Sequence, residues 1–202
     1  MNARQPRLIL ASASPRRLQF LKNLGLDFTV IPSHIEEFSE KSEAADIVED
    51  LALMKARDVA SKLDKNNNSI VLAADTIVVR DQDLLGKPRS KEEAYEMLMS
   101  LSGRAHQVYT GVAIVRVKDN FCKSLSRVSS VYFRKLLDTE ARCYANSEEP
   151  SDKAGAYALQ GTAAAFVERV EGCYTNIIGL PVSDTVLLLR EFGMTVLGCD
   201  GN

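Results

Sequence analysis

The sequence has few of the residues that build metal centres and covalent cross-links. Its 202 residues include two histidines and four cysteines, and no two cysteines form a CxxC pair. Two histidines exclude a histidine-rich metal site, and the cysteine spacing fits neither a zinc site nor a disulfide framework. We therefore expect reduced thiols, as in cytoplasmic proteins, at Cys122, Cys143, Cys173 and Cys199.

Long apolar runs and a surplus of positive charge are also missing. No apolar run approaches the ~20 residues of a membrane span, and the start, MNARQPRLIL, has no signal-peptide apolar core. The formal net charge is -2, whereas proteins that grip nucleic acid usually carry a basic surplus. We expect a cytoplasmic protein whose partners include neither a membrane nor a nucleic-acid polymer.

The apolar pattern predicts an α/β protein, with one domain over residues 1–202. Apolar runs predict strands at RLILAS, DFTVIPS and SIVLAADTIVV, a hairpin of HQVYTGVAIVRV with RVSSVYFRKL, and a strand at AFVERV. Helical spacing and end signals predict helices from Pro15 to about Gly25, over 43–63, at SKEEAYEMLMSLSG with a Ser90–Glu93 capping box, near DTEARCYAN, and at GLPVSDTVLLLREFG. Strands and helices mix without strict alternation, which favours a mixed sheet.

The stretch LASASPRR breaks a rule of helix stability. Ser14 and Pro15 predict a helix start, yet Arg16 and Arg17 follow where the helix dipole favours acidic side chains. With Ser12, the helix start and its arginines form an anion site that suits phosphate. The alternative is a surface helix with two solvated arginines.

Two more charged residues lie in apolar surroundings. Lys55 occupies the apolar stripe of its predicted helix, so it either snorkels past the core or reaches into a cleft. Asp75 interrupts the apolar strand VLAADTIVV, where a buried carboxylate needs a cation or several donors. Metal ligand, general base and partner in a structural ion pair all remain open for Asp75, and we favour a functional role.

A rigid turn, LLGKPRS, holds Lys87 ahead of a capped helix, either to meet a phosphate or as a plain surface turn. The arginine and lysine side chains named above would neutralise the phosphates of a Mg²⁺-triphosphate. The acids, which include Glu36 and Glu37 of IPSHIEE, would suit its metal. The Walker A pattern is absent, which excludes a P-loop NTPase.

The motifs LASASPRR, IEE, LALMKA, AADTIVV, LGKP, LSGRAHQVYTGVAI, DKAGAYALQG and GLPV resemble, in this order, those of Maf-like proteins, which are nucleoside triphosphate pyrophosphatases. The resemblance covers about residues 8–190. It implies a mixed, twisted sheet flanked by helices, in two lobes with the nucleotide in the cleft between them, and often a homodimer. The implied reaction converts a nucleoside triphosphate and water to the monophosphate and pyrophosphate, with a divalent cation such as Mg²⁺ or Mn²⁺.

The resemblance also implies residue roles. Asp75 matches the proton acceptor, and Glu36 matches a second acid that helps Asp75 to hold the metal. The phosphate-binding set is matched by Ser12, Arg17, Lys55 and Lys87. The positions that sort substrates between subfamilies are matched by Arg16, Thr76 and Gln160.

Arg16 and Gln160 place the resemblance in the dTTP/UTP branch. The amide of a glutamine offers a donor and an acceptor together, which suits the O4 and N3–H edge of thymine or uracil. Two alternatives stay open: a 7-methyl-GTP pyrophosphatase, and a nucleotide-binding regulator of cell division that acts without turnover.

Overall fold

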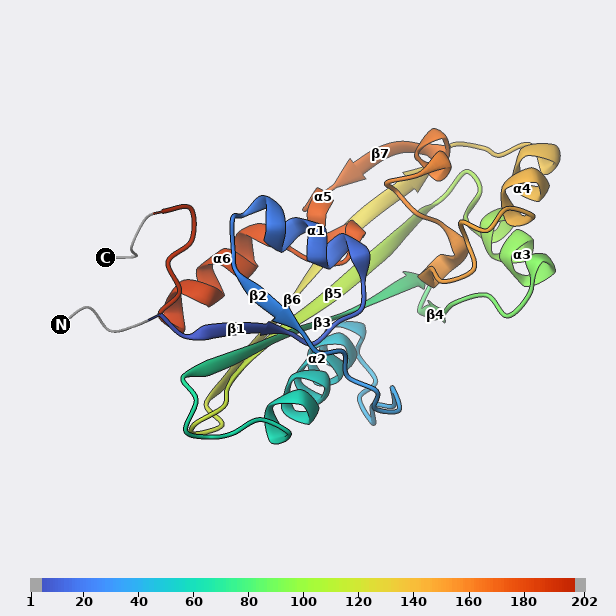
Figure 1. Ribbon diagram of the computed structural model, residues 1–202. Helices are drawn as coiled ribbons and strands as arrows, with labels where there is room; N and C mark the ends of the chain where they lie inside the picture. Colours follow the sequence, from blue (N-terminus) through green and yellow to red (C-terminus); the bar gives the residue numbers. More distant parts are fainter. Residues whose placement is uncertain (1–4, 199–202) are drawn as a thin grey trace. The chain divides into compact units, whose positions relative to one another are not determined.

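The strands form one mixed sheet in the computed structural model, which describes residues 5–198 (Figure 1). Its order is β2-β1-β3-β5-β6-β7, with β4 paired to β3. β1 runs parallel to β2 and β3, whereas β4 and β7 run antiparallel to β3 and β6. The strands are β1 (Arg7–Leu10), β2 (Phe28–Val30), β3 (Ser69–Arg80), β4 (Asp83–Leu85), β5 (Ala105–Arg116), β6 (Cys122–Phe133) and β7 (Val167–Glu171). The predicted mixed sheet is confirmed.

Six α-helices accompany the sheet within residues 5–198. They are α1 (Pro15–Asn23), α2 (Ala44–Ser61), α3 (Lys91–Leu101), α4 (Asp138–Ala145), α5 (Tyr174–Ile178) and α6 (Val182–Glu191). Short 3₁₀ helices span Ala154–Ala156 and Thr162–Phe166. The five predicted helices are present, whereas β4, α5 and the 3₁₀ helices were not predicted.

The chain divides into two compact units. The first comprises the described residues up to Asp75, Thr110–Ser126, and the described residues from Gly179 onward. The second comprises Thr76–Tyr109 and Arg127–Ile178. Strands β3, β5 and β6 each contribute some residues to the first unit and some to the second.

In the first unit, apolar side chains alternate between the two faces of the sheet. On one face Leu8 and Leu10 pack in a cluster that includes α1 and α6 side chains. On the other face Ile9 packs in a cluster with the small α2 residues Ala52 and Ala56. Helices α1 and α6 cover one face of this part of the sheet and α2 covers the other (Figure 1). The period of two along β1 therefore buries both of its faces, as the continuous apolar run of this strand predicts.

Helix α2 approaches the sheet unusually closely. A Cβ atom added to Gly111 of β5 would overlap the carbonyl group of Val48 in α2, so only glycine fits there. Lys55 follows Val48 by seven residues, two helical turns, and so shares its face of the helix. The close approach therefore carries the base of the Lys55 side chain toward the sheet.

In the second unit, α3 and α4 pack with β5 and β6 residues around an aromatic cluster that includes Phe133, Tyr144 and Phe166. The predicted cap of α3 is partly confirmed. Ser90 Oγ accepts a hydrogen bond from the Glu93 amide at 3.1 Å, but the Glu93 carboxylate accepts from Arg89 N–H rather than from Ser90.

The described helices and cysteines agree with what the composition predicts. None of the helices in residues 5–198 combines the length and the apolar character needed to cross a bilayer. Cys122, Cys143 and Cys173 are free thiols, as expected. Cys199 lies outside the described residues.

His106 is buried in the second unit, with 2% of its surface exposed. Its Nε2 atom shares a hydrogen bond of 2.8 Å with the Tyr157 hydroxyl, and its ring stacks edge-on against Phe133. Burial lowers the pKa of His106 to about 4. The imidazole is therefore neutral in the folded protein at neutral pH.

This buried imidazole predicts a pH dependence of folding. The unfolded chain binds the His106 proton below its usual pKa near 6.5, and the folded chain binds it only near 4. The free energy of unfolding should therefore fall by up to about 3 kcal/mol between pH 6.5 and 4. Urea denaturation across this range measures the slope. His106→Gln should flatten it, and His34→Gln, at the exposed second histidine, is the matched comparison.

Candidate functional site

The start of α1 carries the first part of the site. Ser12 follows β1 and is 8% exposed. Its Oγ atom accepts hydrogen bonds from the Ser14 amide and from Arg17 Nη1, both at 3.2 Å. Arg17 Nε donates to the Gly179 carbonyl at 2.8 Å. Ser14 occupies the N-cap position without a side-chain cap, and the first turn contains no acid. The amino end of α1 is thus built from donors and cations, which suits an anion.

Arg17 lies in a strongly charged environment. Burial lowers the pKa of its guanidinium, and the like charge of Arg16 lowers this pKa as well. The carboxylates of Asp75 and Glu37 act in the opposite direction and raise it. An arginine remains protonated at neutral pH under such shifts. The predicted residues Arg16, Arg17 and Asp75 therefore interact electrostatically within the first unit.

Lys55 connects two carboxylates through one ammonium group. Its Nζ atom lies 2.6 Å from Asp75 Oδ1 and 2.7 Å from Glu37 Oε1. The side chains of Lys55 and Asp75 are 12% and 9% exposed, whereas that of Glu37 is 53% exposed. The apolar-stripe lysine thus reaches the strand acid instead of snorkelling to solvent.

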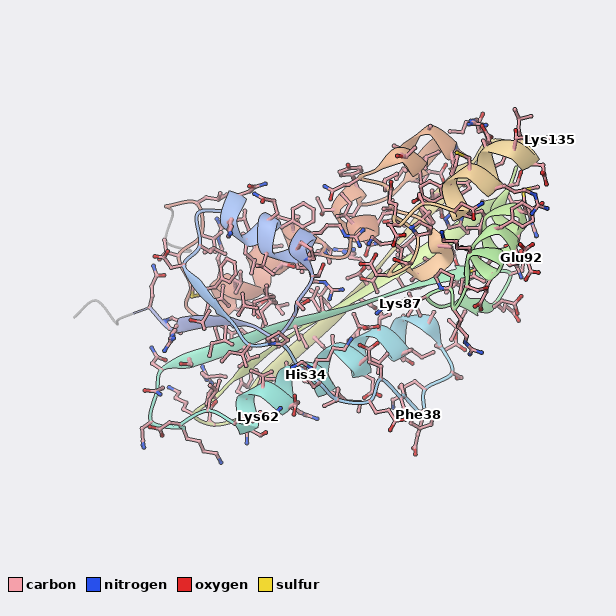
Figure 2. All side chains as sticks on the ribbon, turned by 45° about the vertical axis from the view of Figure 1, so that its right-hand side comes forward. His34, Phe38, Lys62, Lys87, Glu92 and Lys135 are labelled. Carbon is pink, nitrogen blue, oxygen red and sulfur yellow. The ribbon has the colours of Figure 1, made fainter. Side chains whose placement is uncertain are left out.

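The second acid at this ammonium is Glu37, which lies on a loop that is hydrogen-bonded to α2 on both sides of it. The loop between β2 and α2 is tied to the helix by hydrogen bonds from Ser33 to Asp58 at 2.8 Å and from Ser39 to Asp50 at 2.6 Å. Phe38 points outward from this loop (Figure 2) and is 67% exposed. Lys55 is thus contacted by Glu37, whereas the family resemblance implies its neighbour Glu36 as the second acid.

The second unit contains the remaining predicted residues. Thr76 follows Asp75 directly on β3. Lys87 lies on the exposed turn after β4 (Figure 2), where the Gly155 amide donates to the Gly86 carbonyl at 3.0 Å. Gln160 is exposed on a turn closed by the Gly161 amide, which donates to the Ala158 carbonyl at 3.1 Å.

The acids near Lys55 are the candidates for holding a metal ion. Residues 5–198 contain no cluster of three or more His, Cys, Asp or Glu side chains suited to holding an ion. Asp75 and Glu37 nevertheless converge on one point, the Lys55 ammonium. One or two carboxylates, completed by phosphate oxygens and water, are the usual protein contribution to a Mg²⁺–nucleotide site.

The structure is that of an α/β protein with one mixed sheet, whose first unit contains a helix start rich in donors and cations and a buried acid paired with a lysine. The family model described as Maf-like protein matches residues 7–192. The chain therefore belongs to the Maf-like protein family, as the motifs predicted.

Its relatives match over nearly their whole lengths. A dTTP/UTP pyrophosphatase of Thermoanaerobacter sp. (strain X514) is 48% identical over 192 residues, which cover 95% of this chain and 100% of the relative. A dTTP/UTP pyrophosphatase of Hahella chejuensis is 46% identical over 196 residues, 96% of each chain. One of Acetivibrio thermocellus is 42% identical, covering 95% of this chain and 98% of the relative.

The buried Lys55–Asp75 pair predicts an asymmetry in stability. Lys55→Met removes the partner of a buried carboxylate and should lower the free energy of unfolding by about 3 kcal/mol. The double variant Lys55→Met/Asp75→Asn, which buries no uncompensated charge, should lose less than the single variant. Urea denaturation with matched m-values provides the measurement.

Lys62→Met provides the control on the same helix. Lys62 pairs with Asp58 at 2.8 Å, but its side chain is 55% exposed. This substitution should cost only about 0.5 kcal/mol. Equal losses for Lys55→Met and Lys62→Met would show that the Lys55 pair is not effectively buried.

Proposed function

We propose that this protein is a pyrophosphatase that hydrolyses dTTP and UTP to the monophosphate and pyrophosphate, with the whole chain acting as one catalytic domain. The observation that carries the proposal is the near-full-length match to the dTTP/UTP pyrophosphatase of Thermoanaerobacter sp., at 48% identity. The pairing of Asp75 with Lys55 supports it, because the acid and the cation that this chemistry needs already lie together.

In the proposed reaction, Asp75 takes a proton from the attacking water. The water oxygen forms a bond to the α-phosphorus, and the bond from this phosphorus to the α–β bridging oxygen breaks. Pyrophosphate leaves with the bond electrons. Lys55 and Arg17 neutralise phosphate charge, and Ser12 orients Arg17 through its hydrogen bond. Lys87 acts as a further phosphate-binding cation.

A divalent cation, Mg²⁺ or Mn²⁺, fits this chemistry, and it would neutralise triphosphate charge when bound. Asp75 and one acid of the loop after β2 are the residues proposed to hold it. The family resemblance implies Glu36, whereas the contact with Lys55 favours Glu37. Asp75 and Glu37 would then hold the metal, and the Lys55 ammonium would be available to phosphate oxygens.

Selection of the base is assigned to Arg16, Thr76 and Gln160. The amide of Gln160 is exposed and can pair with the O4 and N3–H edge of uracil or thymine. A site built on such paired polar contacts rejects bases that leave them unpaired.

We also propose that the protein acts in the cytoplasm as a homodimer. Free thiols at Cys122, Cys143 and Cys173 suit a reducing compartment. Exposed apolar side chains such as Val128 and Tyr174, at 46% and 52%, are of the kind that a second copy would cover.

A substrate panel tests the proposed reaction. The protein is incubated with Mg²⁺ or Mn²⁺ and, separately, dTTP, UTP, CTP, dATP, GTP and 7-methyl-GTP. Ion-exchange chromatography should detect monophosphate with equimolar pyrophosphate from dTTP and UTP. Diphosphate with free phosphate would place the attack at the γ-phosphorus and overturn the mechanism. Preferred turnover of 7-methyl-GTP would overturn the substrate assignment, and nucleotide binding without turnover would favour the regulator.

Neutral variants test the acids one at a time. Asp75→Asn should reduce kcat at least ~100-fold while nucleotide binding persists, because a general base contributes about 10²–10⁴ to the rate. Glu37→Gln should reduce kcat and raise the metal concentration needed for half-maximal rate. Glu36→Gln, one residue away, is the matched comparison. A larger loss of kcat for Glu36→Gln than for Glu37→Gln would show that Glu36 is the second acid.

A further inference from the structure

The turn that presents Gln160 is held on both sides by two residues from the end of α4 and the segment after it. Before the turn, the Ala158 amide donates to the Tyr144 hydroxyl at 3.2 Å. After it, the Thr162 amide donates to Glu149 Oε2 at 3.2 Å. The two partners are joined, because the Tyr144 hydroxyl donates to Glu149 Oε1 at 3.1 Å. One connected network therefore fixes both ends of the Gln160 turn.

This network is anchored in the core of the second unit. Tyr144 and Ala158 are each 5% exposed. The Tyr144 ring packs edge-on against Phe166, with ring centroids 5.3 Å apart. The hydroxyl is thus held by a fixed ring, and the hydrogen bond to a carboxylate is charge-assisted.

The backbone around Glu149 also directs its side chain. The Ser147 hydroxyl donates to the Tyr144 carbonyl at 2.7 Å, and the Glu149 amide donates back to this hydroxyl at 3.3 Å. The buried Pro150 follows and fixes the next backbone angle. The carboxylate consequently lies against the backbone of the turn.

Gly161 shows how close this approach is. A Cβ atom at residue 161 would collide with the Glu149 carboxylate, with Oε1 as the nearest atom. The glycine next to Gln160 therefore provides the space through which Glu149 reaches the turn. Positive φ is not the reason for this glycine, because its backbone is extended, with φ -148°.

We propose that Glu149 and Tyr144 are positioning residues for Gln160, and that they set its preference for the uracil and thymine edge. The inference rests on the proposed function, in which Gln160 reads the base. A side-chain amide distinguishes one base from another only when its donor and acceptor point in a fixed direction. A turn that is held at both ends fixes this direction. Loosening the network should therefore weaken base selection and leave proton transfer at Asp75 in place.

The decisive experiment compares Glu149→Gln with Glu148→Gln. Glutamine at 149 keeps the side-chain length and removes the charge, while Glu148 is its exposed neighbour. Steady-state kinetics with dTTP, UTP and CTP give kcat and KM for each. Glu149→Gln should raise KM for dTTP and UTP about tenfold, keep kcat within about twofold, and reduce the dTTP over CTP preference about tenfold. Glu148→Gln should match the parent protein.

A double-mutant cycle separates positioning from general stability. In a Gln160→Ala background, Glu149→Gln should cause no further loss of base preference, because Glu149 affects this preference only through Gln160. Tyr144→Phe keeps the ring packed on Phe166 and deletes only the hydroxyl, so it serves as the second variant if Glu149→Gln folds poorly. It should change the preference in the same direction.

Two outcomes are distinguishable. If the parent protein prefers dTTP over CTP and both Glu149→Gln and Tyr144→Phe retain this preference, the positioning role is wrong and the proposed function stands. The same conclusion follows if every nucleotide loses kcat equally. If the parent protein does not hydrolyse dTTP or UTP, the proposed function itself fails.

Discussion

One ammonium group organises the first unit. Lys55 Nζ contacts Asp75 from β3 and Glu37 from the loop after β2, so a helix, a strand and a loop meet at a single positive charge. The contact depends on how closely α2 lies on the sheet, and Gly111 permits this by leaving space for the Val48 carbonyl. A helix with large side chains on this face would stand farther from the sheet, and the lysine would lose its partners.

The ion pair shows how a charged residue is accommodated in an otherwise apolar strand. Replacing a buried pair with apolar residues is often neutral or stabilising, so stability alone gives little reason for Asp75 and Lys55. The pair is accounted for by the proposed function, in which Asp75 serves as the base and Lys55 as a cation for the phosphates. In the same unit, Ser12 and the Gly179 carbonyl each accept a hydrogen bond from Arg17, so the direction of its guanidinium is fixed by the protein itself.

Much of the fold could be predicted because apolar periodicity directly reflects burial. The run from Ser69 to Arg80 is buried on both faces and was recognisable as a strand. The short β4 was missed because the turn before it uses Asp81 and Gln82 at positive φ, without the glycine that marks such turns. Adjacent acids in a loop carry no periodicity, so pattern could not decide whether Glu36 or Glu37 faces Lys55. The Tyr144–Glu149 network depends on tertiary placement and leaves no local signal.

The close fit of Glu149 against Gly161 has a consequence for how this protein can change over evolutionary time. Any side chain at 161 would occupy the volume of the Glu149 carboxylate. A side chain at 161 would therefore push this carboxylate aside, and the turn would lose the hydrogen bond between the Thr162 amide and Glu149. Residues 149 and 161 should therefore vary together among related sequences, because a glutamate at 149 holds the turn only while residue 161 leaves room for its carboxylate.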